Sequence, residues 1–361
     1  MDKKILCTIR VSEVPLHLYQ IIAGFMLLEK KGILSLKIEN SLKKLPYNMM
    51  EVELDNKLKI LYDVNDGYDN LNEASSDYIS FYDSLLKSYD FCFKRSFSYE
   101  YNKKLKYRDK MKKLGLNYMV TIKKNLAHNI YNLDPKKEKI KKIIRKFPIS
   151  QYYNNRYLIE KFEEKPKVNK RPKVLFIARL WDPNGIELKK MPKEKIDERN
   201  SINELRIKCI HACKERFGDQ FIGGIVQSSY AKAVCDDLII NDKKITLRDN
   251  YLNLMKSCDI CIATTGLHGS IGWKFAEYIA ASKVIVSEKL NYELPGDFEK
   301  GKNYLEFNNV EECVKNIEEL INNEKKRLDI MNNNYLYYNN YVKPDVLVLN
   351  TLKEIGVRVN L

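Results

Sequence analysis

Apolar residues recur along the first part of the chain in short runs that alternate between strand and helix spacing. Residues 4–9 form a short apolar run typical of a strand, and residues 34–38 form a second one. Between them, apolar positions from Leu18 to Leu28 recur every three or four residues, which predicts a helix that ends at Gly32. This alternation predicts an α/β domain.

Polar clusters follow the next two predicted strands, residues 58–62 and 91–93. Binding sites of open α/β sheets lie at the carboxyl ends of strands, so both clusters are candidate site residues. A turn rich in Asp, Asn and Gly also explains the acidic loop 63–69, and an ion pair between the two clusters explains their charges. The candidates are Asp63, Asp66, Lys94 and Arg95.

The second half of the chain has a more regular pattern, in which strands and helices alternate throughout. Such a pattern predicts a parallel, doubly wound sheet. An extended piece at 245–247 precedes a helix that we expect Asp249 or Asn250 to cap and that ends near Lys256. The predicted strands are 173–178, 221–226, 259–264, 284–287 and 304–307, and the other helices are 202–217, 274–282 and 310–322.

A charged stretch with two prolines, residues 163–173, is typical of a linker. The chain of 361 residues has the length of about two domains. We therefore predict an N-terminal domain over 1–165 and a C-terminal domain over 170–340. The tail 341–361 contains one more helical segment, residues 346–355.

The formal net charge is +15. It indicates either an anionic partner or a compositional bias of the source genome. Residues 135–147 predict a basic amphipathic helix, which either packs on its domain or docks on an anionic membrane surface. No run approaches the ~20 apolar residues of a membrane helix, and the N-terminus has no signal-peptide pattern. We expect a cytoplasmic protein, peripheral at most at the inner face of the membrane.

Eight cysteines occur, and most of them lie in apolar runs, which predicts buried thiols in a reducing compartment. A zinc set drawn from both halves of the C-terminal domain is the alternative. Residues three apart on a strand point to opposite faces, which disfavours that set. The buried thiols expected are Cys7, Cys92, Cys258 and Cys261, and the zinc set would be Cys209, Cys213, Cys258 and Cys261.

The segment 264–278 carries the chemistry of the C-terminal half. It predicts a strand end, a loop with three glycines and the start of a helix, where free backbone amides favour an anion. Lys274 lies in the first helical turn, which is unfavourable against the helix dipole unless an anion is bound. Glu277 lies three residues later on the same face, so the pair could hold a phosphate and a ribose. An exposed ion pair on a capped helix is the alternative.

Residues 276–281 and the following strand 284–287 resemble the donor-binding region of GT-B glycosyltransferases of the large group-1 type. Glu277 matches the second of the family's two glutamates, which contacts the nucleotide ribose. The position of the first glutamate is Gly269 here, and His268 or Ser270 could substitute for it. Phe176 to Leu180 resembles the family's strand that ends in an arginine contacting the donor diphosphate, here Arg179.

The resemblance implies an α/β protein of GT-B type, with two Rossmann-like, doubly wound domains facing each other across a cleft. The first would bind the acceptor and the second the nucleotide-sugar, with the final helix packing back on the first. The activity implied is transfer of a sugar from a nucleotide-sugar to a glycan or lipid-linked acceptor, in bacterial surface polysaccharide synthesis.

Each candidate residue then has an expected role. Developing negative charge on the departing diphosphate would be met by cations and helix-start amides, so neither a metal nor a further cofactor is expected. A general base, if one is used, would come from the N-terminal domain. Donor binding is assigned to Arg179, Gly266, His268, Gly269, Ser270, Lys274 and Glu277, catalysis to Asp63, Asp66 and His17, and acceptor binding to Lys94 and Arg95.

Three other functions fit part of the sequence. A nucleotide-sugar epimerase of the same fold would need more carboxylates and histidines in its cleft, and the chain has four histidines. A basic nucleic-acid-binding protein would explain the charge, but the lysines are dispersed and no nucleic-acid motif occurs, so no nucleic-acid partner is expected. A non-catalytic relative that scaffolds an assembly would explain the missing first glutamate.

Overall fold

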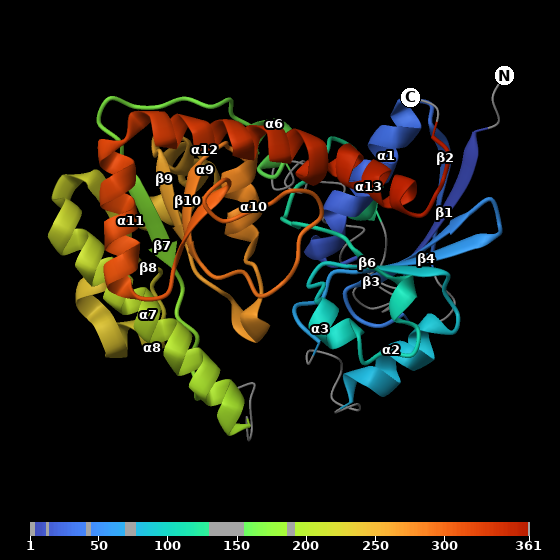
Figure 1. The fold of residues 1–361 in the computed structure, drawn as a ribbon, viewed down its shortest axis with the longest axis horizontal. Helices are drawn as coiled ribbons and strands as arrows, with labels where there is room; N and C mark the ends of the chain where they lie inside the picture. Colours follow the sequence, from blue (N-terminus) through green and yellow to red (C-terminus); the bar gives the residue numbers. More distant parts are fainter. Residues whose placement is uncertain are drawn as a thin grey trace. The chain divides into compact units, whose positions relative to one another are not determined.

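The computed structural model describes residues 4–11, 14–40, 45–68, 77–129, 155–185 and 192–359. The chain forms two compact units (Figure 1). Unit 1 consists of residues 1–162, 291–297 and 338–361, and unit 2 consists of residues 163–290 and 298–337. Each unit has its own sheet and its own hydrophobic core, which confirms the α/β class.

Unit 1 contains a six-stranded sheet of order β2-β1-β3-β4-β5-β6. Its neighbouring strands are parallel except for β3, which runs antiparallel to both β1 and β4 and was not predicted. Asp55 and Asn56, both with positive φ, make the tight turn between β3 and β4, because Asp and Asn tolerate the left-handed conformation. The strands are β1 (Ile5–Val11), β2 (Leu34–Asn40), β3 (Met49–Leu54), β4 (Leu58–Asp63), β5 (Phe91–Lys94) and β6 (Met111–Lys113).

Helices α1 (Tyr19–Lys30) and α13 (Pro344–Glu354) pack against each other and share the core of unit 1 (Figure 1). Their backbones approach closely at Gly24, where a Cβ would lie 2.2 Å from the carbonyl oxygen of Pro344. The other helical segments are η1 (Leu16–Leu18), α2 (Tyr78–Leu86), α3 (Tyr99–Asn102), η2 (Arg108–Lys110), η3 (Leu126–Asn129), α6 (Ile159–Phe162) and η8 (Tyr338–Val342).

Unit 2 contains a five-stranded, fully parallel sheet of order β11-β10-β9-β7-β8, as its alternating pattern predicts. The strands are β7 (Val174–Ala178), β8 (Phe221–Ile225), β9 (Ile260–Ala263), β10 (Val284–Glu288) and β11 (Tyr304–Phe307). The helices are α7 (Lys193–Phe217), α8 (Ser229–Cys235), α9 (Arg248–Ser257), α10 (Trp273–Ala280), α11 (Val310–Asn322) and α12 (Glu324–Tyr337), with short turns η4 (Gly218–Gln220), η5 (Asp236–Leu238), η6 (Lys243–Thr246) and η7 (Leu267–Gly269).

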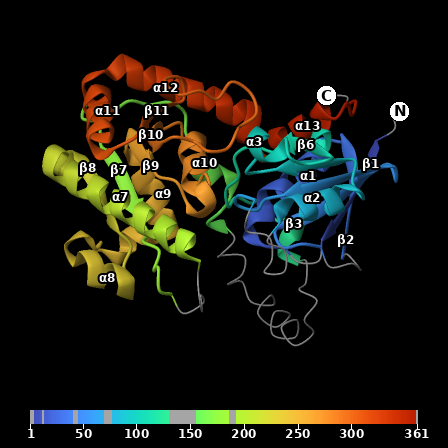
Figure 2. The same cartoon turned by 60° about the horizontal axis from the view of Figure 1, so that its bottom comes forward.

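Helices α7 and α11 lie side by side on one face of this sheet (Figures 1 and 2). Their apolar residues pack on Phe176, Ile262 and Val286 to form the core of unit 2. All eight cysteines of the chain are buried free thiols, which confirms the expectation for the four named above. Within the described residues, no group of three or more metal-binding side chains is close enough to hold a metal ion.

Several predicted boundaries differ from the observed ones. Helix α7 begins at Lys193, nine residues before the predicted start. The prediction of an extended piece at 245–247 is wrong, because Lys243–Thr246 forms a 3-10 turn. The predicted cap of α9 is also wrong: the helix begins at Arg248, with Leu247 at the N-cap and Asp249 in the first turn. The predicted basic helix 135–147 lies outside the described residues.

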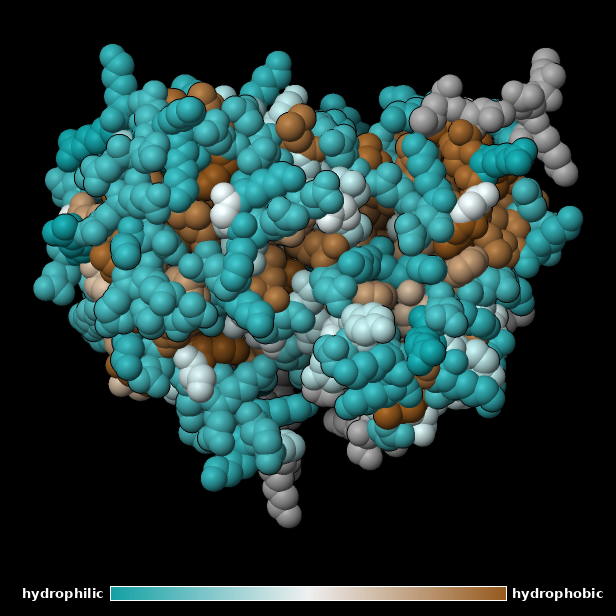
Figure 3. All heavy atoms as spheres, in the orientation of Figure 1, coloured by the Kyte–Doolittle hydropathy of each residue, from teal (hydrophilic) through white to brown (hydrophobic). Residues whose placement is uncertain are grey.

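None of the helices in the described parts of the chain is long and apolar enough to cross a membrane. The face seen in Figure 3 is dominated by hydrophilic residues, with smaller apolar patches between them. The high content of charged residues, 31%, is consistent with this surface.

Candidate functional site

The sheet of unit 2 changes its winding direction between β7 and β9. From β7 the chain continues to β8 on one side, and it then returns to place β9 on the other side. In open α/β sheets a ligand binds outside the carboxyl ends of the strands at such a point. Arg179 directly follows β7, and the glycine-containing loop 264–272 directly follows β9. Both segments singled out in the sequence therefore leave the sheet on either side of this point.

The loop 264–272 is held in a compact conformation that leads into α10. The backbone N–H of Gly266 donates to the carbonyl of Ser270 at 2.8 Å, and His268 and Gly269 both have positive φ. Helix α10 begins after Gly272, which offers no side chain to cap it, and its first turn contains no acidic residue. The positive end of the helix dipole at this first turn favours an anion.

Lys274, in the first turn of α10, points back toward the sheet. Its ammonium group donates to the carbonyl of Ile177 and lies 5.2 Å from the centre of the Tyr251 ring. The pKa of Lys274 is lowered to about 8, mainly by burial: the carboxylate of Glu277 raises it, and the nearby guanidinium groups lower it. A bound anion would reverse this shift, because it would favour the charged form.

Glu277, one turn further along α10, is buried with a relative exposure of 2%. One of its carboxylate oxygens, Oε1, accepts from Nη2 of Arg248 at 2.7 Å. The other oxygen, Oε2, is buried and has no hydrogen-bond partner in the protein. A buried carboxylate oxygen without a donor is costly, so Oε2 is a candidate acceptor for a hydroxyl group of a ligand.

The charges around Lys274 do not cancel within unit 2. The guanidinium groups of Arg179, Arg206 and Arg248 lower the pKa of Lys274, and the carboxylate of Glu277 raises it. Three guanidinium groups therefore lie near its ammonium group. A second carboxylate, Glu288 at the end of β10, accepts from the backbone N–H of Thr265 at 2.7 Å. The site is therefore electropositive, which suits a multiply charged anion.

A cavity of about 550 Å³ lies at the carboxyl end of β8. Strand β8 is the neighbour of β7 in the sheet, and Arg179 follows β7. Apolar side chains of Val226 and Ile240 form part of the cavity wall. Its polar lining consists of Gln227, Ser228, Ser229, Lys232 and Thr246. The lining is therefore mostly polar, with one cationic side chain, Lys232.

In unit 1, the cluster at the ends of β4 and β5 is neutralised internally. Asp63 and Lys94 are fully buried and form an ion pair at 3.0 Å. Oδ2 of Asp63 also accepts from the Tyr82 hydroxyl at 2.6 Å, and Oδ1 accepts from the backbone and side chain of Asn65, each at 2.9 Å. The alternative interpretation of the sequence, an ion pair between the two clusters, describes this geometry.

Three other candidate residues of unit 1, Arg95, Asp66 and His17, lie close to one another. Arg95 and Asp66 form an ion pair at 2.6 Å. His17 lies close enough for both to influence it: burial lowers its pKa to about 4, Arg95 lowers it too, and Asp66 acts in the opposite direction. The imidazole of His17 is therefore neutral near pH 7 and able to accept a proton. The catalytic and acceptor-binding roles given to these residues stay predictions.

Sequence reasoning missed two arginines of the unit 2 site. Arg206 lies on α7 among the buried positions Ile202, Cys209 and Ile210, and a charged residue on an otherwise apolar helical stripe was the available signal. Arg248 begins α9 and binds Glu277 across 29 residues of sequence. No local pattern indicates such a pairing.

Comparisons with known proteins give a fold likeness only. No family model and no curated protein matches the chain. The C-terminal domain of LpcC, a glycosyl transferase group 1 family protein of Francisella tularensis, is 14% identical, with a TM-score of 0.34 over 51% of this chain and 97% of that one. HepE of Anabaena with UDP-glucose is 13% identical, with a TM-score of 0.43 over 82% and 72%.

TarM of S. aureus, in a complex that contains UDP, is 12% identical to this chain, with a TM-score of 0.44. The match covers 82% of this chain but only 50% of TarM, so the chain spans about half the length of that protein. At these values of identity and TM-score we rest the functional argument on the residues of the site.

Proposed function

We propose that the chain is a nucleotide-sugar-dependent glycosyltransferase whose donor binds at the carboxyl ends of β7 and β9. One observation carries the proposal: Arg179, Arg248 and the buried carboxylate Glu277 lie near the ammonium group of Lys274, and Glu277 has one oxygen without a hydrogen-bond donor. The cations suit a diphosphate, and the carboxylate oxygen suits a sugar hydroxyl. A nucleoside diphosphate ester has both groups a few bonds apart.

The chemistry follows from where the charges lie. When a glycosidic bond to a nucleoside diphosphate breaks, negative charge develops on the departing phosphate. Arg179, Lys274 and the first-turn amides of α10 would stabilise this charge without a bound metal ion. We accordingly propose a metal-independent reaction, with the nucleotide-sugar as substrate and no additional cofactor.

The cavity after β8 would take the nucleoside end of the donor. Val226 and Ile240 would flank a planar base, and Gln227 offers both a donor and an acceptor to its edge. Glu277 Oε2 would accept from a ribose hydroxyl.

For the acceptor we propose the strand ends of unit 1, where Arg95, Asp66 and His17 lie together. Arg95 could bind an acidic group of a glycan or lipid-linked acceptor, and neutral His17 could accept the proton of its hydroxyl. The segment Lys103–Lys113 contains seven lysines and arginines, several of them exposed, and these would favour an anionic membrane surface at the cytoplasmic face.

The test is a panel of nucleotide-sugars, followed by titration calorimetry with the matching nucleoside diphosphate. We expect one donor to bind and its sugar to be transferred to an added glycan or lipid-linked acceptor. Glu277→Gln should weaken diphosphate binding about 10-fold or more. Glu318→Gln, which changes a half-buried carboxylate paired with Arg216 on the surface of the same unit, is the matched control and should bind normally.

Two results would contradict the proposal. Binding of short oligonucleotides in preference to every nucleoside diphosphate would indicate a nucleic-acid-binding protein. Accumulation of an epimerised nucleotide-sugar without an acceptor product would indicate an epimerase.

A further inference from the structure

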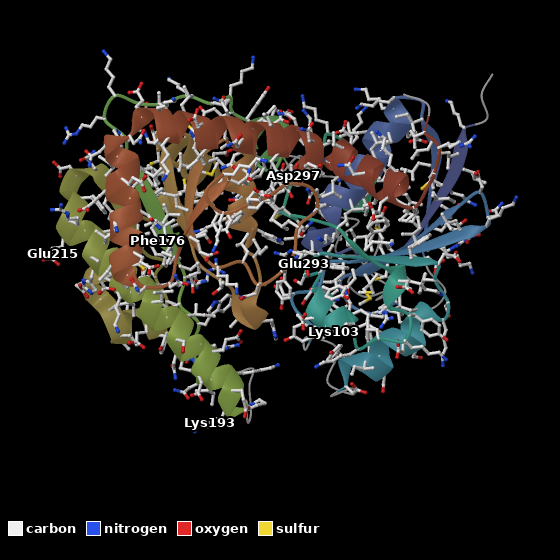
Figure 4. The ribbon with its side chains drawn as sticks, viewed as in Figure 1. Lys103, Phe176, Lys193, Glu215, Glu293 and Asp297 are labelled. Atoms are coloured by element: carbon white, nitrogen blue, oxygen red, sulfur yellow. The ribbon has the colours of Figure 1, made fainter. Side chains whose placement is uncertain are left out.

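One face of α7 carries a series of polar side chains that bind the segment leaving β7. Arg199 donates to the carbonyl of Asp182 at 2.6 Å. One turn later, Asn203 binds both backbone groups of Trp181, accepting from its N–H at 2.9 Å and donating to its carbonyl at 2.7 Å. Figure 4 labels Lys193 and Glu215 near the two ends of this helix. The series therefore fixes the backbone that follows Ala178.

Arg206 is the last residue of this series, and its side chain also contacts the segment that follows β9. Its Nη1 donates to the carbonyl of Arg179 at 2.6 Å, and its Nη2 donates to the carbonyl of Thr265 at 3.0 Å. Its Nε donates to the Thr264 hydroxyl at 2.9 Å. The side chain is buried, and burial lowers its pKa to about 10, so it stays charged at neutral pH. One guanidinium thus connects the exits of β7 and β9.

The strands need such a connection at this point. Strands β7 and β9 pair directly only at Val174 with Ile260 and at Leu175 with Cys261, near their first residues. Toward the carboxyl ends, β7 stays paired with β8 through Ala178 with Ile225, whereas no ladder joins it to β9. The exits of β7 and β9 are therefore not held together by the sheet itself.

We propose that Arg206 is a positioning residue that fixes the separation of Arg179 from the loop 264–272. These are the two halves of the diphosphate site, so the inference rests on the proposed function and deepens it. Each of the three nitrogens of the Arg206 guanidinium donates to a protein oxygen, two on the segment that leaves β9 and one on the segment that leaves β7, which assigns the side chain to holding these segments together. Lys cannot replace it, because an ammonium lacks the planar fork that spans three separate acceptors.

The experiment uses the full chain with Arg206→Met and Arg206→Lys. Arg216→Met, on the same helix, removes an exposed arginine paired with Glu318 and is the matched control. Hydrogen exchange followed by mass spectrometry is measured on the free protein, and inorganic pyrophosphate is titrated calorimetrically as the probe. Thr264→Val, which removes only one of the three acceptors, is a milder variant in case both Arg206 variants fail to fold.

Both Arg206 variants should speed amide exchange about 10-fold at residues 179–182 and 264–272, and leave the strands β7 and β9 unchanged. The dissociation constant of pyrophosphate should rise about 10-fold or more, since misplaced binding groups lose much of their effect. Thr264→Val should show the same local exchange, more weakly.

Two outcomes would overturn the inference. Wild-type exchange and affinity in Arg206→Lys would mean that only the charge matters. Uniformly faster exchange over all of unit 2, or no local change in Arg206→Met, would reduce Arg206 to a buried structural cation. If the wild type itself does not bind pyrophosphate, the proposed function fails, whereas the exchange measurement still decides the role of Arg206.

Discussion

Both units gather charged side chains where parallel strands end, yet the two clusters differ in how their charges are balanced. In unit 1, Asp63 and Lys94 neutralise each other, and both oxygens of Asp63 accept hydrogen bonds. In unit 2, the cations around Lys274 outnumber the carboxylates, and Glu277 Oε2 has no donor. The first cluster is complete without a ligand, whereas the second is not.

The comparison shows that position at a strand end does not distinguish a binding site from a structural cluster. Charge balance and the satisfaction of each buried polar atom do distinguish them. By this criterion Asp63 holds its loop in place, while the side chains of Asp66 and His17 stay partly exposed.

The strongest challenge to the comparison is to remove one member of the Asp63–Lys94 pair. Lys94→Met leaves a buried, uncompensated carboxylate, so we expect unit 1 to lose about 3–5 kcal/mol of unfolding free energy. Adding Asp63→Asn to this variant should recover part of the loss, because the amide is neutral and keeps an acceptor oxygen.

Urea denaturation separates the two units. The two tryptophans, Trp181 and Trp273, belong to unit 2, so their fluorescence follows that unit while hydrogen exchange follows unit 1. Pyrophosphate binding should persist in Lys94→Met. A variant with undiminished stability in unit 1 would show that the pair is not structural.

Changing Lys274 tests the cluster of unit 2. The pKa of Lys274 is about 8 in the folded protein and 10.5 for an ordinary lysine, so the folded state binds fewer protons between these pH values. Burying the charge therefore costs stability below pH 8, and the cost fades as pH rises toward 10.5. Lys274→Met should stabilise unit 2 by about 1–3 kcal/mol at pH 7.

The same variant should abolish pyrophosphate affinity, a loss of about 100-fold or more. In the wild type, affinity should be constant well below pH 8 and fall as pH rises through 8, because the free protein then loses the ammonium charge. Thermal unfolding followed by tryptophan fluorescence at pH 7 and pH 10.5 measures the stability change. A destabilised Lys274→Met protein that still binds pyrophosphate would exclude Lys274 from the site.

The smallest expected effect concerns His17. Its pKa is about 4 in the folded protein and 6.5 for an ordinary histidine, so the folded state binds fewer protons between these pH values. Unit 1 should lose stability as pH falls from 6.5 to 4, by about 1–2 kcal/mol on account of His17. The loss should be absent in His17→Gln, as measured by hydrogen exchange in unit 1. An equal loss in both proteins would mean that the imidazole is not held neutral.

Much of the fold could be predicted because its elements have strong local patterns. The parallel strands of unit 2 are continuous apolar runs, and the helix from Leu18 to Leu28 has clear helical spacing, so their existence follows from burial. Strand β3 was missed because Met49 to Leu54 follows a polar stretch and is defined by its hairpin with β4, a nonlocal partner.

The candidate site was only partly predictable for the same reason. Lys274 and Glu277 lie three residues apart, so their proximity on one helical face follows from helix geometry. The proximity of Arg206 to Thr265 and of Arg248 to Glu277 depends on tertiary packing across 59 and 29 residues. Sequence spacing carries no information on such pairs.

The path of the chain limits how the protein can be divided. Unit 1 is built from three separate stretches, and its helix α13 covers the groove at Gly24 of α1. A fragment that ends at residue 162 would contain α1 without α13, which packs on it. A fragment that starts at residue 163 would contain α13 without α1. Cutting the gene at one point therefore yields two incomplete units, and exchange of a whole unit with another protein would need four matched junctions.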